Sequence, residues 1–549
     1  MVPKGIGELK LRQKIGQMLM CGFHGTEPSE NIERLIREQH LGGIIYFRRN
    51  LTEPAQAAKL SASLQQLALA HGGVPLLIAI DQEGGMVMRI DQGVTPIPGS
   101  MALGATGDVE AAYEAAKVMG SELKAMGINM NFAPCLDINN NPLNPVIGVR
   151  SYGGDAETVG RLGTAAVRGY QEAGIAATVK HFPGHGDTGD DSHTALPVVP
   201  HLRERLDRLE LAPFRQAAEL GVDAVMSAHV LFPAVEPERL PATLSSRVID
   251  GLLRQELGYD GVVVTDCLEM NAIAEHYGIA EGAVMAVEAG ADLVLVSHRI
   301  ERQQTALDAL VQAVESGRIR EERIDRSVER LLALKSRVAS AAVAGADHAP
   351  VASAAVAGAA HHAPGASLAT EASQRLAERI AERSVTLLRG EAGLPLDPAK
   401  PVLVVWPEVR VGTEVDEVLA RRETAGYWLA KLNYRVREER IGVQPTAEEQ
   451  AHVVELAREV EQIVLVTYNA SFSPGQVELA KALAALPKAK LVGAAARNPF
   501  DISVLPDEVK IYLACYENTP FAMKALARVL AGELSAQGKL PAPLEASEG

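Results

Sequence analysis

Eight short apolar runs recur along the first 300 residues, and they constrain the fold more than any other feature of the sequence. They are residues 18–23, 43–47, 75–80, 130–136, 176–179, 224–228, 261–265 and 293–296. The runs are mostly apolar throughout rather than alternating, and several are rich in Val, Ile or Leu, which is typical of parallel strands buried on both faces. Apolar residues at helical spacing lie between many of them, as at 110–126, 160–173, 202–220 and 281–289. This pattern predicts a (β/α)₈ barrel, with an open doubly wound sheet as the alternative.

Polar residues follow five of these runs, at the point where each predicted strand ends. They are Asp81 and Glu83 after the third run, Asp137 and Asn139 after the fourth, Lys180 and His181 after the fifth, His229 after the sixth and Asp266 after the seventh. A barrel gathers the carboxyl ends of all its strands around one mouth, whereas an open sheet spreads them along an edge. We therefore favour a TIM-type barrel over residues 1–338, with one site at its mouth.

The remainder of the chain divides into two parts. In residues 339–372 the stretch Ala-Ser-Ala-Ala-Val-Ala-Gly-Ala occurs twice, which is typical of a low-complexity linker. No cluster of acidic or Cys partners accompanies the linker residues His348, His361 and His362, so we interpret them as solvated rather than as metal ligands.

Residues 373–549 repeat the strand–helix pattern on a smaller scale. Apolar runs occur at 385–388, 402–406, 463–467, 491–496 and 511–515, and helical stretches at 371–384, 445–460, 476–485 and 520–534. The pattern predicts a second domain, an α/β sandwich with a mostly parallel sheet. It contains no Gly-rich phosphate loop, and we predict no cofactor.

The composition excludes several classes of partner. A formal net charge of −16 argues against nucleic acid and anionic membranes. No apolar run approaches the ~20 residues of a membrane span. The N-terminus lacks the pattern of a signal peptide, and the cysteines, Cys21, Cys135, Cys267 and Cys515, form no CxxC pair. We therefore expect a cytoplasmic protein without a disulfide framework.

Residues 180–193, Lys-His-Phe-Pro-Gly-His-Gly-Asp-Thr-Gly-Asp-Asp-Ser-His, concentrate titratable groups in one Gly-rich loop. Packing does not explain such a loop, and loops on rigid strands often carry catalysis. Asp191 stands two residues before His193, where a carboxylate can fix the imidazole tautomer and suit it to general acid–base catalysis. Asp266 ends an apolar strand, and it is a candidate nucleophile or base, with a helix N-cap as the alternative role.

Two other interpretations stay open on the residues alone. His181, His185, Asp187 and His193 are all possible Zn²⁺ ligands, although their spacing matches no HExxH motif and no standard closed zinc set. A barrel that binds a sugar without turning it over would need Asp266 and His193 to be incidental.

The loop at 180–193 closely resembles the signature of the β-N-acetylglucosaminidases of glycoside hydrolase family 3. Other pieces that match the family, in its order, are residues 42–47, 81–85 with Arg89, 132–139, 146–153, 226–230 and 264–266. Beyond the linker, residues 382–388 and 538–541 resemble the second domain of the two-domain bacterial branch.

The resemblance implies a role for each matching residue. Asp266 would be the nucleophile, and His193 the general acid/base, paired with Asp191. The hydroxyls of the sugar would be bound by Asp81, Arg89, Arg150, Lys180 and His181. Met86 and Val149 depart from the family, since a basic residue is usual at the first position and an acidic one is common at the second.

The implied activity is retaining, exo-acting hydrolysis of terminal β-linked N-acetylglucosamine in cell-wall muropeptides or chitin-type oligosaccharides, by a monomer or homodimer. A neutral imidazole repels an incoming anion less than a carboxylate would. A phosphate-dependent β-N-acetylglucosaminide phosphorylase is therefore one alternative, and a metal-dependent barrel hydrolase is another.

Overall fold

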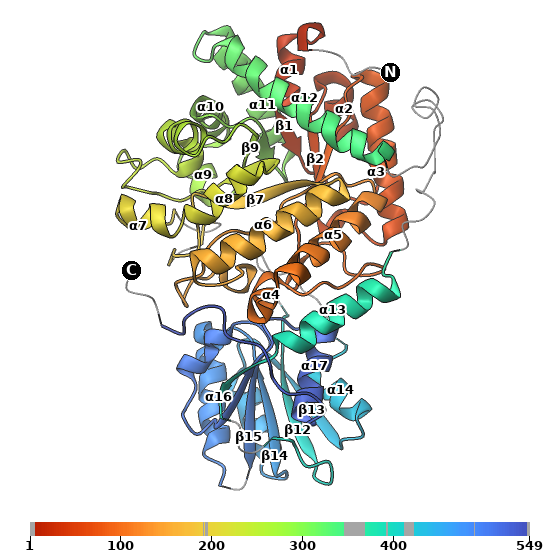
Figure 1. Ribbon diagram of the computed structural model, residues 1–549, viewed down its shortest axis with the longest axis vertical. Helices are drawn as coiled ribbons and strands as arrows, with labels where there is room; N and C mark the ends of the chain where they lie inside the picture. The colour runs from red at the N-terminus through yellow and green to blue at the C-terminus, as the bar shows by residue number, and fades with distance from the viewer. Residues whose placement is uncertain are drawn as a thin grey trace.

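The computed structural model describes residues 6–189, 191–192, 196–344, 368–390, 394–410, 422–487 and 489–545. Figure 1 shows a large upper body of strands surrounded by helices and a smaller lower body built on a second sheet. Within the described residues, no helix combines the length and the apolar character that crossing a membrane requires.

The upper body is a closed parallel barrel, which confirms the predicted fold. Its strands are β1 (Leu19–Cys21), β2 (Gly43–Tyr46), β3 (Leu77–Ile80), β6 (Met130–Asn131), β7 (Ala176–Phe182), β8 (Ala224–Ser227), β9 (Val262–Thr265) and β10 (Val294–Val296). They run in the order β10-β1-β2-β3-β6-β7-β8-β9 with every neighbouring pair parallel. A parallel bridge between Val264 and Leu293 joins β9 to β10 and closes the ring.

Helices surround the barrel strands. They are α1 (Leu11–Gln17), α2 (Glu30–Gln39), α3 (Pro54–His71), α4 (Ser100–Thr106), α5 (Val109–Ala125), α6 (Ala156–Ala173), α7 (Arg203–Arg208), α8 (Ala212–Leu220), α9 (Asn271–Ala274), α10 (Ile279–Ala289), α11 (Ile300–Glu315) and α12 (Glu321–Ala344). Asp155 caps the start of α6, and Gly174 ends it in the left-handed conformation, so the chain turns directly into β7.

The single helix predicted at 202–220 is wrong in one respect, because the chain breaks it into α7 and α8. Pro213 lies in the first turn of α8. A proline has no backbone N–H and clashes with the carbonyl four residues earlier, so it starts a helix more readily than it continues one.

The lower body has a six-stranded sheet with helices on both faces. Its order is β11 (Thr386–Arg389), β16 (Ile511–Ala514), β15 (Lys490–Ala495), β14 (Gln462–Thr467), β12 (Val402–Glu408) and β13 (Val436–Gly442), and only the β11–β16 pair is antiparallel. The helices are α13 (Glu371–Ser384), α14 (Ala425–Lys431), α15 (Ala447–Ala457), α16 (Pro474–Ala484) and α17 (Pro520–Leu530).

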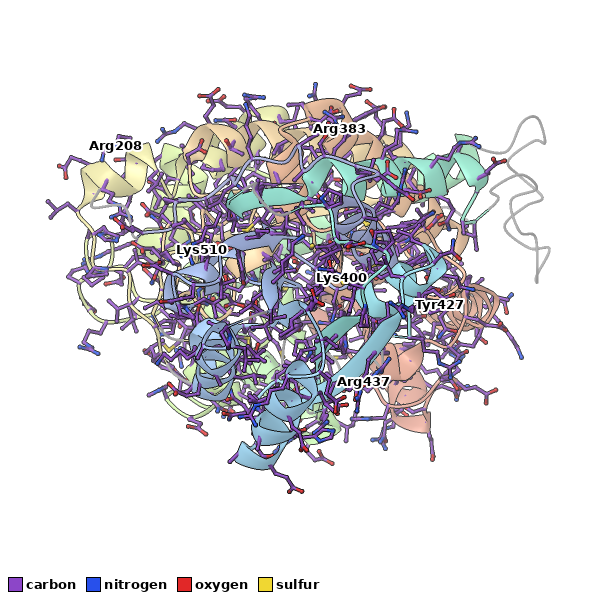
Figure 2. All side chains as sticks on the ribbon, turned by 90° about the horizontal axis from the view of Figure 1, so that it is seen from below. Arg208, Arg383, Lys400, Tyr427, Arg437 and Lys510 are labelled. Carbon is purple, nitrogen blue, oxygen red and sulfur yellow. The ribbon has the colours of Figure 1, made fainter. Side chains whose placement is uncertain are left out.

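Strand β13 was not predicted from the sequence. Its residues, Val-Arg-Glu-Glu-Arg-Ile-Gly, form no apolar run because it is an edge strand. Arg437 of this strand lies at the surface of the second domain, with 52% of its side chain exposed (Figure 2). Charged side chains on an edge strand hinder pairing with another chain, and they also remove the pattern by which a strand is recognised.

The two bodies meet through a small apolar cluster. It contains Met101, Ala102 and Ala105 of α4, Val149, and Phe500, Ala514, Tyr516 and Ala542 of the second domain, with Met86 packed against it. The backbone N–H of Lys539 donates to Ala105 (2.9 Å), and that of Gly154 donates to Pro541 (3.0 Å). Both departures from the family pattern, Met86 and Val149, therefore lie under the second domain, where apolar side chains are favoured.

The predicted linker lies mostly between α12 and α13. Residues 345–367, including His348, His361 and His362, lie outside the described residues. The domain boundaries at 338 and 373 stay predictions.

Candidate active site

A cavity of about 750 Å³ opens at the mouth of the barrel. Six of the residues selected from the sequence line it. Asp81 follows β3, Lys180 and His181 lie on β7, Asp266 follows β9, and Arg89 and Arg150 lie in the segments between β3 and α6. The barrel thus brings polar residues from its strand ends into one cavity, although Asp81 and Asp266 are 185 positions apart in the sequence.

The floor of the cavity holds a buried network of opposite charges centred on Glu83. The Lys180 ammonium lies 2.8 Å from Asp81 and 2.7 Å from Glu83. Arg150 donates two parallel hydrogen bonds to Glu83, at 3.0 and 2.8 Å. Burial alone would raise the pKa of Glu83, but Arg150 and then Lys180 hold that pKa well below its ordinary value. Glu83 therefore fixes the two cations that face the cavity, and sequence reasoning did not select it as a site residue.

Arg89 extends this network toward the rim. Its guanidinium lies 3.7 Å from the second carboxylate oxygen of Asp81. Asp81 therefore lies between two cations, Lys180 and Arg89, and this arrangement orients its carboxylate, which can accept hydrogen bonds from hydroxyl groups of a ligand.

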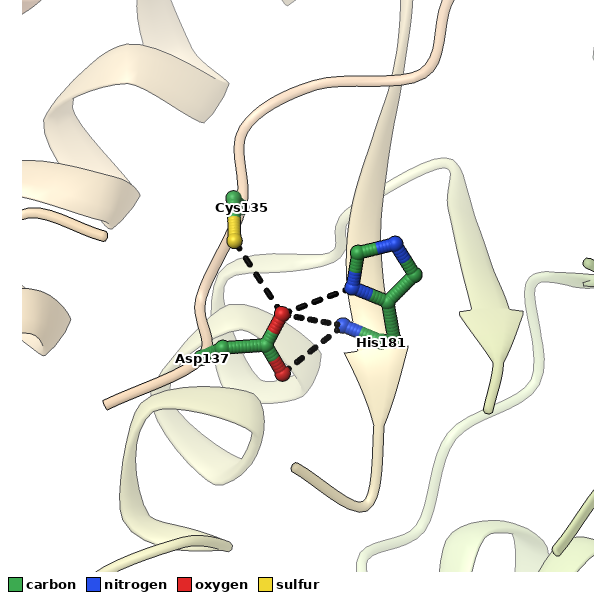
Figure 3. A group of neighbouring side chains, drawn as sticks. All are labelled: Cys135, Asp137 and His181. Carbon is green, nitrogen blue, oxygen red and sulfur yellow. Dashed lines mark hydrogen bonds and ion pairs between the residues drawn. The ribbon is translucent and has the colours of Figure 1, made fainter. Parts of the chain in front are cut away.

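A second carboxylate, Asp137, orients His181 (Figure 3). Its Oδ2 atom lies 2.7 Å from Nδ1 of His181 and 3.1 Å from the Cys135 thiol, which donates to it. Oδ1 accepts the backbone N–H groups of His181 (3.1 Å) and His185 (2.6 Å). Burial would raise the pKa of Asp137, but His181 holds it well below the ordinary value. The carboxylate thus fixes Nδ1 as the protonated nitrogen of His181 and leaves Nε2 for a ligand in the cavity.

The loop after β7 is held by its own histidine. His185 is buried, with Nδ1 at 2.8 Å from the Thr188 hydroxyl and Nε2 at 2.9 Å from the Ser192 hydroxyl. Burial and then the nearby His181 lower the pKa of His185 to about 4, so it is neutral at neutral pH. A Cβ atom at Gly186 would lie 1.9 Å from the carbonyl oxygen of Ile138, so this close approach requires glycine.

Asp187 attaches the same loop to the segment around α7. It pairs with Arg205 at 2.9 Å and with the His201 ring. Asp191 lies in the described loop, whereas His193 lies outside the described residues. The pairing of Asp191 with His193 therefore stays a prediction.

Three of the possible Zn²⁺ ligands named from the sequence form hydrogen bonds or ion pairs with different partners. His181 is bonded to Asp137, His185 to Thr188 and Ser192, and Asp187 to Arg205. In the described part of the chain, His181 and Asp187 belong to different groups of possible ligands. The geometry favours hydrogen-bonding roles for these three residues over a shared metal ion.

Asp266, which follows β9, lines the same cavity and is not a helix N-cap. Its Oδ1 accepts the backbone N–H of Cys267 at 2.7 Å, whereas the next helix, α9, has Met270 at the capping position. His229 fixes the turn, since its Nε2 lies 3.0 Å from the carbonyl oxygen of Cys267. Burial raises the pKa of the Cys267 thiol to about 12, so this thiol stays protonated at neutral pH.

The outer wall of the cavity is basic and was not predicted. Its side chains include Phe47, Arg48, Arg49, Glu269, Arg299 and Arg302. The Arg49 guanidinium stacks 4.2 Å from the centre of the Phe47 ring, and Arg302 lies 3.7 Å from Glu269. These residues come from the ends of β2, β9 and β10. Phe47 ends the apolar run at 43–47, but no motif or apolar run singles out the charged residues of this wall.

The Glu83→Gln variant is expected to lose about 3 kcal/mol of unfolding free energy at neutral pH, because Lys180 and Arg150 would stay buried with one counter-charge fewer. The pKa of Glu83 is lower in the folded protein than its ordinary 4.5, so its stabilisation is complete above that pH and is lost in acid. The difference in unfolding free energy between the variant and the wild type should therefore become smaller below about pH 4.

Denaturant unfolding of both proteins from pH 3.5 to 7.5 measures this difference. The matched control is Glu461→Gln, which breaks an exposed pair with Lys400 and should change stability by less than about 0.5 kcal/mol. A Glu83→Gln protein as stable as wild type at pH 7 would contradict the prediction.

Comparison with known proteins agrees with this geometry. Residues 10–334 match the family model described as the glycosyl hydrolase family 3 N-terminal domain. The chain is 34% identical over 442 residues to Beta-hexosaminidase A of Pseudoalteromonas piscicida, covering 73% of this chain and 71% of that protein. It is 40% identical over 289 residues to a Beta-hexosaminidase of Alkalilimnicola ehrlichii, covering 52% and 81%.

Among solved structures, a glycoside hydrolase family 3 beta-N-acetylglucosaminidase from Paenibacillus sp. str. FPU-7 is similar over both bodies of the chain. The TM-score is 0.93 at 67% sequence identity, and the match covers 98% of this chain and 100% of that one. The barrel and the second domain therefore form an arrangement that a related protein shares.

Proposed function

From the finding that this chain belongs to glycosyl hydrolase family 3 and is a glycoside hydrolase, we propose that it is a retaining, exo-acting β-N-acetylglucosaminidase. The observation that carries the proposal is the convergence, in one cavity, of Asp266 with the charged floor of Asp81, Lys180 and Arg150. The similar Paenibacillus protein is called a beta-N-acetylglucosaminidase, which supports N-acetylglucosamine as the sugar, and the relatives called Beta-hexosaminidase are consistent with it.

The mechanism that we propose has two displacement steps. Protonated His193 donates its proton to the glycosidic oxygen while the Asp266 carboxylate attacks the anomeric carbon, and the bond to the leaving group breaks. A covalent glycosyl-aspartate forms with inverted configuration. Neutral His193 then removes a proton from water, which attacks the same carbon, releases Asp266 and restores the original configuration.

The floor residues bind the non-reducing sugar in this proposal. Lys180, Arg150 and Arg89 donate hydrogen bonds, and Asp81 accepts them, so a ring of hydroxyls has partners of both kinds. His181 offers its Nε2 atom beside Lys180. Such contacts hold the anomeric carbon near Asp266 and supply part of the transition-state binding.

The natural substrate that we favour is a cell-wall fragment, with chitin-type oligosaccharides second. This preference rests on the family resemblance. Cytoplasmic location and a monomeric or homodimeric state also stay predictions.

One assay tests the proposed function. Purified full-length protein should release nitrophenol from 4-nitrophenyl N-acetyl-β-glucosaminide, and the activity should survive EDTA. Loss of activity with EDTA would favour a metal-dependent hydrolase, and binding without turnover would favour a silent sugar-binding barrel. Added phosphate should leave free N-acetylglucosamine as the product, whereas N-acetylglucosamine 1-phosphate would identify a phosphorylase.

A further inference from the structure

A small antiparallel ribbon in the barrel carries the two charged cavity residues Glu83 and Arg89. It consists of β4 (Gln82–Gly84) and β5 (Val87–Met88), with Glu83 on the first strand and Arg89 directly after the second. The side-chain amide of Gln82 links the arms, since it accepts the N–H of Arg89 at 2.8 Å and donates to Ile90 at 2.7 Å. The position of this ribbon therefore sets the positions of Glu83 and Arg89.

The turn of the ribbon has little freedom. Gly84 and Gly85 have φ angles of +93° and +56°, a conformation that side chains other than glycine rarely adopt. The N–H of Gly85 donates to the carbonyl of Ile97 at 2.8 Å. A Cβ atom at Gly84 would lie 3.0 Å from the same carbonyl oxygen, so the barrel confines the turn on one side.

The other side of the turn meets a carboxylate from the second domain. Glu517 lies between β16 and α17 and is 1% exposed. Its Oε2 accepts the backbone N–H of Gly99 at 2.7 Å, and its Oε1 accepts the Thr519 hydroxyl at 2.6 Å. A Cβ atom at Gly85 would lie 2.6 Å from that same Oε2. The carboxylate thus packs between the turn of the ribbon and the segment that enters α4.

Glu517 is a charged residue at a site where an apolar residue would be expected. Met86, Val149 and Tyr516 line the same small interdomain cavity, in which packing alone would be served by an apolar residue. Burying a carboxylate is costly unless it makes hydrogen bonds that an apolar residue could not replace. Glu83 and Arg150 also border this cavity, so Glu517 stands directly behind the floor of the active site.

We propose that Glu517 is a positioning residue for sugar binding: the second domain holds the Gly84–Gly85 turn through this carboxylate. The turn then places Glu83, and Glu83 places Lys180 and Arg150 beneath the sugar. The inference rests on the proposed function for its kinetic consequence. Its structural consequence, an ordered ribbon, does not depend on that function.

The kinetic test uses full-length Glu517→Ala and Glu517→Gln proteins with 4-nitrophenyl N-acetyl-β-glucosaminide. Small misplacement of binding groups is costly, so Glu517→Ala should raise KM about tenfold, with kcat changed by less than about threefold. Gln at 517 keeps an oxygen that can accept from Gly99 and should restore KM to within about twofold of wild type. Rescue by the amide separates positioning from a general loss of folding, which thermal unfolding monitors.

The matched control is Arg383→Ala. Arg383 of α13 pairs with Asp108 at the start of α5, so its loss weakens a contact between the two bodies that involves neither the ribbon nor the small cavity beside Glu517. This variant should keep the wild-type KM. An equal rise of KM in Arg383→Ala and Glu517→Ala would overturn the proposal, because general docking would then explain both. A folded Glu517→Ala protein with the wild-type KM would overturn it as well.

Hydrogen exchange measured by mass spectrometry supplies a readout that needs no activity. Amides of residues 82–89 should exchange at least about tenfold faster in Glu517→Ala than in Arg383→Ala. Equal exchange in the two variants would overturn the inference even if the enzyme proved to have another substrate. If Glu517→Ala does not fold, Glu517→Asp takes its place, since one methylene fewer withdraws the carboxylate from Gly99. A folded Glu517→Asp protein with wild-type KM and exchange would again overturn it.

Discussion

Asp266→Asn should lower kcat for 4-nitrophenyl N-acetyl-β-glucosaminide by about 10⁴-fold, the scale on which enzymes lose activity when a nucleophile is removed. The amide has the shape of the carboxylate, and its oxygen can still accept the N–H of Cys267. The fold should therefore survive, and thermal unfolding should match that of wild type. What the amide lacks is the charge and basicity with which the carboxylate attacks the anomeric carbon.

Azide sharpens this test. In Asp266→Ala the space of the missing carboxylate can admit a small anionic nucleophile, so azide should restore turnover and yield the α-glycosyl azide. Recovery with the β product, or an Asp266→Asn protein with near-normal kcat, would show that the nucleophile has been assigned wrongly. Asp308→Asn, which alters an exposed pair with Arg12, serves as the control and should retain full activity.

His193→Ala should have an effect that depends on the leaving group. A general acid contributes about 10²–10⁴-fold when the departing oxygen needs a proton. We expect kcat/KM to fall by about 10³-fold for a chitin-type disaccharide, because a sugar alkoxide is a poor leaving group. The loss should be below about tenfold for a 2,4-dinitrophenyl glycoside, whose phenolate departs unprotonated.

The comparison of the two substrates decides the assignment of His193. An equal loss on both would mean that His193 acts in binding or folding rather than as the acid. His71→Ala, at the exposed end of α3, is the control and should change neither rate. Asp191→Asn should share the pattern of His193→Ala with a smaller amplitude, since Asp191 would act through the imidazole.

The barrel was predictable because burial on both faces of a parallel strand leaves an apolar run in the sequence. All eight barrel strands begin inside such runs. Strand β13 lies at the edge of its sheet and carries exposed charged residues, so its sequence contains no apolar run. The break between α7 and α8 depends on one proline. The apolar residues on both sides of it keep helical spacing, so their pattern does not reveal the break.

Site residues at the ends of strands could be predicted from the sequence. Residues whose role depends on a contact with a residue distant in the sequence could not. Asp81, Lys180 and Asp266 follow apolar runs directly and line the cavity as expected. Glu83 also follows an apolar run, but its role in holding Arg150, 67 positions away, became recognisable only through their contact. Glu517 contacts Gly99 across 418 positions, a separation that no local pattern encodes.

Because the imidazole of His181 is held in one tautomer, the cavity floor offers a hydrogen-bond acceptor beside a hydrogen-bond donor. Asp137 accepts a hydrogen bond from Nδ1–H, so in the neutral ring Nε2 accepts hydrogen bonds and does not donate them. The adjacent Lys180 only donates. A hydroxyl can satisfy both neighbours at once, whereas an ether oxygen, a carbonyl or a fluorine satisfies only Lys180. With the sugar bound as we propose, the pair would therefore distinguish a free hydroxyl from one that is substituted or linked to another sugar, by the direction of a hydrogen bond rather than by size.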